Sequence, residues 1–215
     1  MGVRLEKGQG VSLEKSHHDL SQVTIGLGWD VNPNTGLLAK RGGASSTDYD
    51  LDVIAFLCGA DGKVKDLGWD KAGKATLVNS DVVHFNNMKH RSGCVWMTGD
   101  DRTGAGGGDG DDEQIIVRLN DLPAAFAKLV FVVQIYKGRE HGQTFGEVRN
   151  AYIRASDARG QEMARFDLSG GEAYQDCRSL LFAELECNPG GGWTFRAIGT
   201  PSPSDNFVDW LKQYL

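Results

Sequence analysis

Long apolar runs are missing from this sequence, and none approaches the roughly 18 residues that a membrane-spanning helix needs. The first residues, MGVRLEKGQGVSLEKS, lack the apolar core of a secretory signal. Cysteine is also scarce, and no two cysteines form a C-x-x-C pair. We therefore expect no transmembrane segment, a cytoplasmic location and free thiols. The cysteines are Cys58, Cys94, Cys177 and Cys187.

Positive charge is in deficit, because 23 Lys and Arg face 29 Asp and Glu and the formal net charge is −6. A protein that binds duplex nucleic acid needs a basic face to neutralise phosphates. The basic clusters are short, and we interpret both Lys40-Arg41 and Lys89-His90-Arg91 as solvated surface. We therefore expect no nucleic-acid partner, whereas the acidic balance suits metal cations.

Helical periodicity is rare, and patterns typical of β-strands take its place. Most apolar runs are short and rich in β-branched or aromatic residues, with Gly, Asp, Asn or Pro in most of the gaps. This pattern predicts an all-β sandwich or barrel. We expect strands at Val23–Trp29, Leu51–Cys58, Ala75–Phe85, Cys94–Thr98, Gln114–Leu119, Lys128–Tyr136, Asn150–Ser156, Met163–Leu168, Leu180–Glu186 and Trp193–Ile198.

One helical pattern lies at the C-terminal end of the chain. Ser204 is a candidate N-cap for a short helix over Ser204–Leu215. We expect its apolar stripe to dock on the sheet, because an exposed stripe with Trp and Tyr favours aggregation. A partner-binding helix is the alternative. The residues that recur at helical spacing are Phe207, Trp210, Leu211 and Tyr214.

Acidic residues crowd between Asp100 and Glu113, where six of the fourteen residues are carboxylates and only Arg102 opposes them. Crowded carboxylates repel one another, so a folded loop that holds them close needs a counter-charge. The glycines of the loop allow a tight backbone that turns carbonyl groups inward. Calcium takes six to eight such oxygens at flexible geometry. The loop therefore predicts a calcium site, although a charge run is more commonly a solvated loop.

A second acidic set overlaps the start of a predicted strand. Asp48, Asp50 and Asp52 alternate with aromatic or apolar residues, so their carboxylates share one face of the strand. Like charges on one face destabilise a strand unless something compensates them. A metal shared with the acidic loop would compensate, and Asp30 at the end of the first predicted strand could join it.

Other kinds of site fit these residues less well. An EF-hand that starts at Asp48 would need Gly in place of Val53 and Glu in place of Gly59. A phosphate loop would need a Gly-Lys-Ser/Thr ending or G-x-G-x-x-G, and carboxylates would repel phosphate. The five histidines show no zinc-ligand spacing, and no G-x-S-x-G elbow is present. We therefore expect that the protein is not an enzyme.

Four parts of the chain match the motifs of one known family: Ile25–Asp30, Asp50–Leu57, Gly99–Gly104 with Gly108–Ile115, and Phe145–Val148 with Asn150–Arg154. Through them the chain resembles the TerD family of tellurium-resistance and stress-response proteins over nearly its whole length. The resemblance implies a single domain over residues 1–215, built as a β-sandwich of two antiparallel sheets. It also implies calcium binding, with two ions close together, and no biochemical activity is agreed for the family.

The acidic pattern and the resemblance together predict a calcium-binding adaptor or scaffold associated with tellurite resistance. Its expected partners are other Ter-type proteins or membrane-associated stress complexes. A rival hypothesis is a thiol-dependent redox or tellurite-handling protein that uses the free cysteines, since soft thiolates suit tellurium. The resemblance adds Asn150 to the expected metal ligands, and Asp101 is not included among them. The expected metal ligands are Asp30, Asp50, Asp52, Asp100, Asp109, Gly110, Asp111, Asp112, Glu113 and Asn150.

Overall fold

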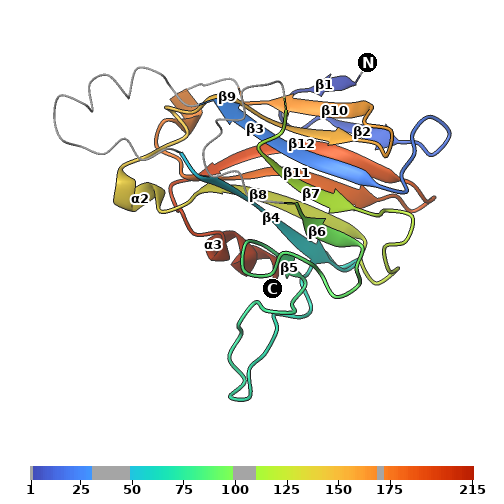
Figure 1. The fold of residues 1–215 in the computed structure, drawn as a ribbon, viewed down its shortest axis with the longest axis horizontal. Helices are drawn as coiled ribbons and strands as arrows, with labels where there is room; N and C mark the ends of the chain where they lie inside the picture. Colours follow the sequence, from blue (N-terminus) through green and yellow to red (C-terminus); the bar gives the residue numbers. More distant parts are fainter. Residues whose placement is uncertain (1, 31–48, 99–109, 169–171) are drawn as a thin grey trace.

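The structure is a computed structural model that describes residues 2–30, 49–98, 110–168 and 172–215. Two six-stranded sheets pack face to face in this part of the chain (Figure 1). The expected all-β sandwich is confirmed. The strands are β1 (Val3–Leu5), β2 (Gly10–Leu13), β3 (Val23–Asp30), β4 (Leu51–Cys58), β5 (Val82–Val83), β6 (Val95–Met97), β7 (Glu113–Val117), β8 (Lys128–Ile135), β9 (Arg149–Ser156), β10 (Glu162–Asp167), β11 (Ser179–Cys187) and β12 (Trp193–Ser202).

The first sheet has the strand order β1-β10-β9-β3-β7-β6, and the second has the order β2-β12-β11-β8-β4-β5. Neighbouring strands are antiparallel except β1 and β10, which pair in parallel. The antiparallel expectation therefore fails at this one edge. A parallel pair needs a long connection between its strands, and most of the chain lies between β1 and β10.

Strand β4 shows how the core is built, because all of its residues are buried. Its odd-numbered residues, from Leu51 to Leu57, pack in the core between the two sheets. Its even-numbered residues from Ile54 to Cys58 belong to a second apolar cluster on the outer face of the second sheet. Burial on both faces explains why this strand is almost continuously apolar, and the sequence predicted its bounds correctly.

The C-terminal segment covers that outer face, as the sequence predicted. Phe207, Trp210 and Leu211 are buried in the second cluster, and the Trp210 indole donates a hydrogen bond to Ser179 Oγ at 2.9 Å. The helix is shorter than expected, with α3 at Val208–Leu211 followed by the 3₁₀ turn η2 at Lys212–Tyr214. Ser204 is not the N-cap, because Phe207 occupies that position. None of the helices in the described ranges is long and apolar enough to cross a bilayer.

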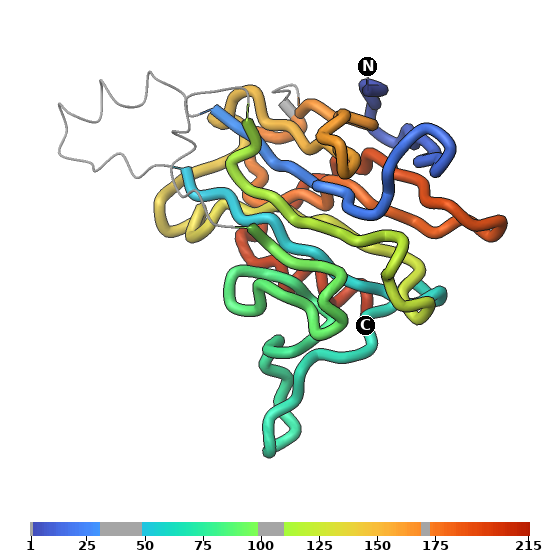
Figure 2. Tube along the Cα trace, turned by 45° about the vertical axis from the view of Figure 1, so that its right-hand side comes forward, coloured from blue at the N-terminus to red at the C-terminus, as the bar shows by residue number. Residues whose placement is uncertain are grey.

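The expectation of a strand over Ala75–Phe85 is wrong except at β5. Residues 66–79, called the arm from here on, project away from the sandwich between β4 and β5 (Figure 2). Leu77 and Asn79 have positive φ angles of 59° and 53°, which interrupt an extended strand. The short edge strands β1 and β2, the helix α2 (Gly138–His141) and the 3₁₀ turn η1 (Glu172–Tyr174) were not predicted either.

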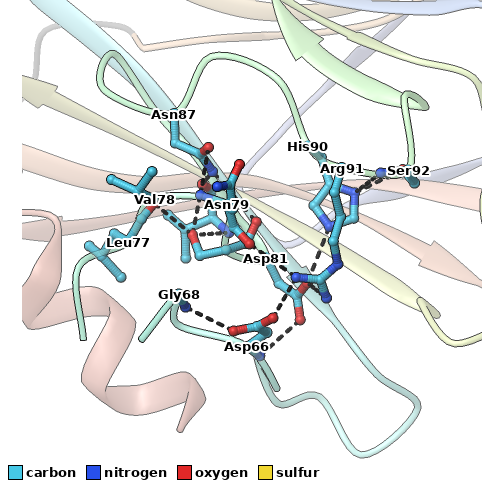
Figure 3. Close-up of polar contacts among 12 residues, drawn as sticks. Asp66, Gly68, Leu77, Val78, Asn79, Asp81, Asn87, His90, Arg91 and Ser92 are labelled. Carbon is cyan, nitrogen blue, oxygen red and sulfur yellow. Dashed lines mark hydrogen bonds and ion pairs between the residues drawn. The ribbon is translucent and has the colours of Figure 1, made fainter. Parts of the chain in front are cut away.

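A buried carboxylate fixes the base of the arm (Figure 3). Asp81 accepts hydrogen bonds from the Asp66 backbone N–H at 2.9 Å and from Arg91 Nη2 at 2.8 Å, and His90 Nε2 lies 3.1 Å from its Oδ1 atom. His90 is 2% exposed, and its Nδ1 atom lies 2.8 Å from Ser92 Oγ. The interpretation of Lys89-His90-Arg91 as solvated surface is therefore wrong for His90, which is a structural residue.

Candidate metal centre

Four strand ends meet at one end of the sandwich, on the left in Figure 1. Because β3 is antiparallel to β7 and β9, its last residues lie beside their first: Asp30 pairs with Arg149 of β9, and Leu27 pairs with Glu113 of β7. Strand β4 of the second sheet starts at the same end, and the Val53 N–H donates a 2.6 Å hydrogen bond to Glu113 Oε2 on β7. The sequence therefore brings acidic residues from both sheets to one place.

Asp112 and Glu113 lock the start of β7 against its neighbours. The Asp112 N–H donates to the Leu27 carbonyl oxygen at 2.8 Å, and Asp112 Oδ2 accepts the Trp29 N–H at 2.9 Å. Glu113 is 2% exposed and holds β4 through the bond to Val53. These backbone contacts fix the positions of both carboxylates at the strand ends.

Asp111 is held on the outer face of the first sheet. Its Oδ1 atom accepts hydrogen bonds from Arg154 Nε at 2.8 Å and from the Tyr152 hydroxyl at 3.1 Å, and its Oδ2 atom accepts one from Gln114 at 3.3 Å. Gly26 leaves room for this carboxylate, because a Cβ atom there would lie 2.0 Å from Asp111 Oδ2. These contacts favour an anchoring role for Asp111.

Tyr152 joins this anchor to the backbone of the acidic loop. Its hydroxyl lies 3.0 Å from the carbonyl oxygen of Gly110, so it bridges Gly110 and Asp111. Burial and the neighbouring Asp111 charge raise the pKa of Tyr152 to about 12, so the hydroxyl stays a neutral donor. Sequence reasoning missed both Tyr152 and Arg154, although the Asn-x-Tyr-x-Arg motif contains them.

Asn150 contacts Asp30 through a local irregularity of β9. The register between β3 and β9 shifts between Gly28 and Asp30, and Asn150 has a left-handed φ of 51°. Bulges of this kind re-aim a side chain, and Asn tolerates the left-handed region better than most residues. The Asn150 amide nitrogen donates to Asp30 Oδ2 at 2.6 Å, which leaves the amide oxygen as the atom suited to a cation.

Asp50 and Asp52 lie at the start of β4, but Asp52 faces the outer side of the second sheet. Its Oδ2 atom accepts a hydrogen bond from Gln134 Nε2 at 3.1 Å. Gln134 in turn accepts the Phe207 N–H at 2.8 Å, which ties Asp52 to the C-terminal segment. Strand β4 therefore separates Asp52 from Glu113, which points between the sheets. The Asp50 carbonyl oxygen accepts the Tyr136 N–H at 2.8 Å.

The donor chemistry at this end of the sandwich fits calcium, since carboxylate, amide and carbonyl oxygens are the ligands that calcium prefers. The described residues do not complete a cluster by themselves, because no three of their His, Cys, Asp or Glu side chains are grouped to hold an ion. Asp100 and Asp109 lie outside the described residues, as does Asp48. The ligand set therefore stays a prediction.

Three of the four cysteines are poorly placed for thiol chemistry. Cys58, Cys94 and Cys177 are buried, and only Cys187 is exposed. Burial raises the pKa of Cys58 and of Cys177 to about 12, which lowers their thiolate fraction at neutral pH. Since the thiolate is the reactive form, the rival hypothesis depends mainly on Cys187.

Comparisons with known proteins agree with the fold and the motifs. A model of the TerD domain matches residues 1–214. The chain is 59% identical to tellurium resistance protein TerX of Serratia marcescens over the full length of both proteins. It is 35% identical to stress response protein SCP2 of Bacillus subtilis, also over both full lengths. These relatives carry the names of resistance and stress-response proteins.

A solved structure has the same fold. The crystal structure of a homologue of telluride resistance protein (TerD) from Streptomyces coelicolor A3(2) superposes with a TM-score of 0.61. It is 23% identical to the chain, and the alignment covers 87% of this chain and 94% of that one. At this identity the likeness supports the fold alone.

Proposed function

Since this chain belongs to the TerD family, we propose that it is a cytoplasmic, calcium-binding stress-response protein that acts as an adaptor and contributes to tellurite resistance. The observation that carries the calcium proposal is the meeting of β3, β4, β7 and β9 at one end of the sandwich. Oxygen donors from both sheets lie there, and hydrogen bonds from Trp29 and Val53 fix Asp112 and Glu113.

Each proposed ligand has a defined origin in the chain. Asp112, Glu113, Asp30 and the Asn150 amide oxygen stand at the ends of the first sheet, and Asp50 stands just before β4. Asp52 is left out of the proposed site, because it contacts Gln134 on the outer face of the second sheet. Asp100, Asp109 and the Gly110 carbonyl come from the acidic loop. Asp111 supports the loop through Arg154 and Tyr152. One or two bound calcium ions would supply positive charge that cross-links the two sheets and neutralises the crowded acids.

A calorimetric titration of chelator-stripped protein with calcium tests this proposal. We expect saturable binding and a rise in melting temperature of roughly 5–10 °C at a hundredfold excess of calcium over Kd, because such binding adds about 2.7 kcal/mol to the free energy of unfolding. The double variant Asp30→Asn, Asp112→Asn should bind calcium at least tenfold more weakly, because it removes two anionic ligands.

The matched control is the double variant Asp61→Asn, Asp70→Asn. Both control carboxylates accept backbone N–H groups in the segment after the opposite end of β4, so the charge change is equal and lies away from the proposed site. Its calcium affinity should equal that of the parent protein. Absence of both heat and thermal stabilisation in the parent protein would rule out the calcium proposal, and equal weakening by both double variants would rule out this location.

The adaptor role is supported by apolar side chains on the arm. Trp69 is 59% exposed and Val78 is 50% exposed. Large exposed apolar groups on a projecting segment favour aggregation unless a partner covers them. We propose that the arm contacts other Ter-type proteins. Capture of purified TerD- or TerZ-type relatives should be lost with Trp69→Ala and retained with the exposed-residue control Val3→Ala. Equal capture by both variants would exclude the arm as the contact surface.

The thiol hypothesis has one accessible candidate. If thiol chemistry provides tellurite resistance, Cys187→Ser should abolish resistance in a complemented strain. The calcium proposal predicts that Cys187→Ser retains resistance and that the Asp30→Asn, Asp112→Asn variant loses it. The two outcomes separate the hypotheses in a single growth assay.

A further inference from the structure

A cavity of about 640 Å³ opens beside Asn150, at the ends of β9 and β10. Its charged lining comes from three arginines on three strands, with a single carboxylate among them. The cavity therefore carries two more positive than negative charges, in a protein whose net charge is −6. The charged residues are Arg4 on β1, Arg149 on β9, and Arg165 and Asp167 on β10.

Asp167 forms ion pairs with two of the three arginines, Arg4 and Arg165. Arg4 Nη1 lies 3.1 Å from Asp167 Oδ2, and Arg165 Nε lies 2.7 Å from Asp167 Oδ1. Arg149 is exposed, and among the residues that the structure describes its guanidinium pairs with no carboxylate. Arg149, which has no such ion pair in the described part of the chain, and the two arginines that share the Asp167 carboxylate together offer hydrogen-bond donors to an anion.

Arg165 is held in place from a second side. Its guanidinium carbon lies 3.7 Å from the centre of the Tyr152 ring, which stacks a cation on an aromatic face. Tyr152 is itself fixed by Asp111 and Gly110. A guanidinium that packing has already ordered loses little entropy when it binds an anion in bidentate fashion.

The floor of the cavity is apolar. Val148, Ala151 and Leu168 line it and are buried. The Asn150 amide adds a polar group at the rim. A site with an apolar floor, few polar groups and a cationic rim suits a small ligand that has both an anionic group and an apolar part.

We propose that this cavity binds an oxyanionic ligand of the phosphate class, with Arg149 and Arg165 as the anion-binding residues. The apolar floor favours a phosphate ester with an aromatic or alkyl group over the free inorganic ion. The inference goes beyond the calcium proposal and does not depend on it. The two proposed sites share Asn150 at the rim, but the arginines that would hold the anion are not proposed metal ligands.

Calorimetric titration of the full chain tests the inference, with phenyl phosphate and inorganic phosphate as probes at constant ionic strength. We expect saturable binding in the presence of chelator, so that loss of calcium binding leaves this result unaffected. Tighter binding of phenyl phosphate would identify an ester, and equal binding would identify the free oxyanion. Lack of saturable binding by either probe would overturn the inference.

Three variants locate the binding. Arg149→Gln should weaken it about tenfold, because it removes one charge-assisted contact without breaking an ion pair described in the structure. Asp167→Asn should tighten it, because it removes the carboxylate that competes for Arg4 and Arg165. Arg196→Gln on β12 of the other sheet is the matched control and should leave Kd unchanged. Equal Kd values for Arg149→Gln and Arg196→Gln would overturn the inference.

Discussion

The Asp111 carboxylate carries three contacts that organise the start of β7. Only 4% of its side chain is exposed, and its partner Arg154 is 25% exposed. While it is intact, such a pair adds little to the free energy of unfolding, because both charges lose hydration on burial. Removing one partner is costly, because the other charge then stays buried without compensation. Breaking this ion pair should therefore lower the free energy of unfolding more than breaking an ion pair on the surface.

Arg154→Met should therefore lower the free energy of unfolding by about 3 kcal/mol, measured by urea denaturation. The matched control is Arg118→Met, which breaks an ion pair with Asp121 whose two side chains are 51% and 49% exposed. The control should cost less than about 1 kcal/mol. Equal losses in the two variants would contradict the anchoring role of Asp111.

At the scale of elements, a second carboxylate clamps the turn after β9 to the loop before β3. Asp157 accepts hydrogen bonds from the backbone N–H groups of Asp19, Arg159 and Gln161 and from the Arg159 guanidinium. Burial alone raises the pKa of Asp157, but the hydrogen bonds from Arg159, Gln161 and Asp19 outweigh it and lower the pKa to about 2. The clamp therefore depends on an ionised Asp157.

The folded-state pKa of Asp157 lies below its ordinary value of 3.8, so its contribution is full above about pH 4 and is lost as the pH falls toward 2. The difference in the free energy of unfolding between the parent protein and Asp157→Asn should be about 2 kcal/mol near neutral pH and should shrink below about pH 4. Urea midpoints measured from about pH 6 to about pH 3 check this. A difference that stays constant over the whole range would show that ionisation of Asp157 is irrelevant.

The C-terminal segment is the element whose packing has the clearest energetic consequence. Trp210 is 5% exposed and donates a hydrogen bond to Ser179. Trp210→Ala should lower the free energy of unfolding by about 3–5 kcal/mol, because it leaves a cavity in the cluster on the outer face of β4. Trp69→Ala on the arm makes the same chemical change at a site that is 59% exposed, and it should change stability by less than about 0.5 kcal/mol. Chemical denaturation of the two variants compares them directly.

Over the whole molecule, the strands that the sequence predicted well are those in which apolar residues alternate or run together between turn residues. Strand β4 was predicted at its observed bounds, and β3, β6, β8, β9, β10 and β11 within one residue at each end. Strand β7 ends two residues earlier than expected, and β12 continues four residues past its expected end to Ser202. Short edge strands such as β1 and β2 were not predicted, because three or four residues carry too little pattern. The arm was not predicted, because the apolar residues around Leu77 resemble a strand until positive φ angles interrupt them.

The candidate site was only partly predictable for a different reason. The alternation of Asp50 and Asp52 places both on one face of β4, but the sequence does not say what covers that face. The C-terminal segment covers it, so Asp52 contacts Gln134 instead of the donors on β7. Tyr152 and Arg154 were missed because a tyrosine and an arginine carry no metal-ligand signal, although they hold Asp111 in place.

The whole-molecule claim is that calcium joins the two sheets at the end where β3, β4, β7 and β9 meet. A crystal structure of the protein grown with calcium tests it most directly. The account predicts one or two ions at this end, with oxygens from Asp30, Asp112, Glu113 or Asn150 and from the acidic loop at about 2.3–2.6 Å. An ordered acidic loop without an ion, or calcium bound only elsewhere on the molecule, would contradict it.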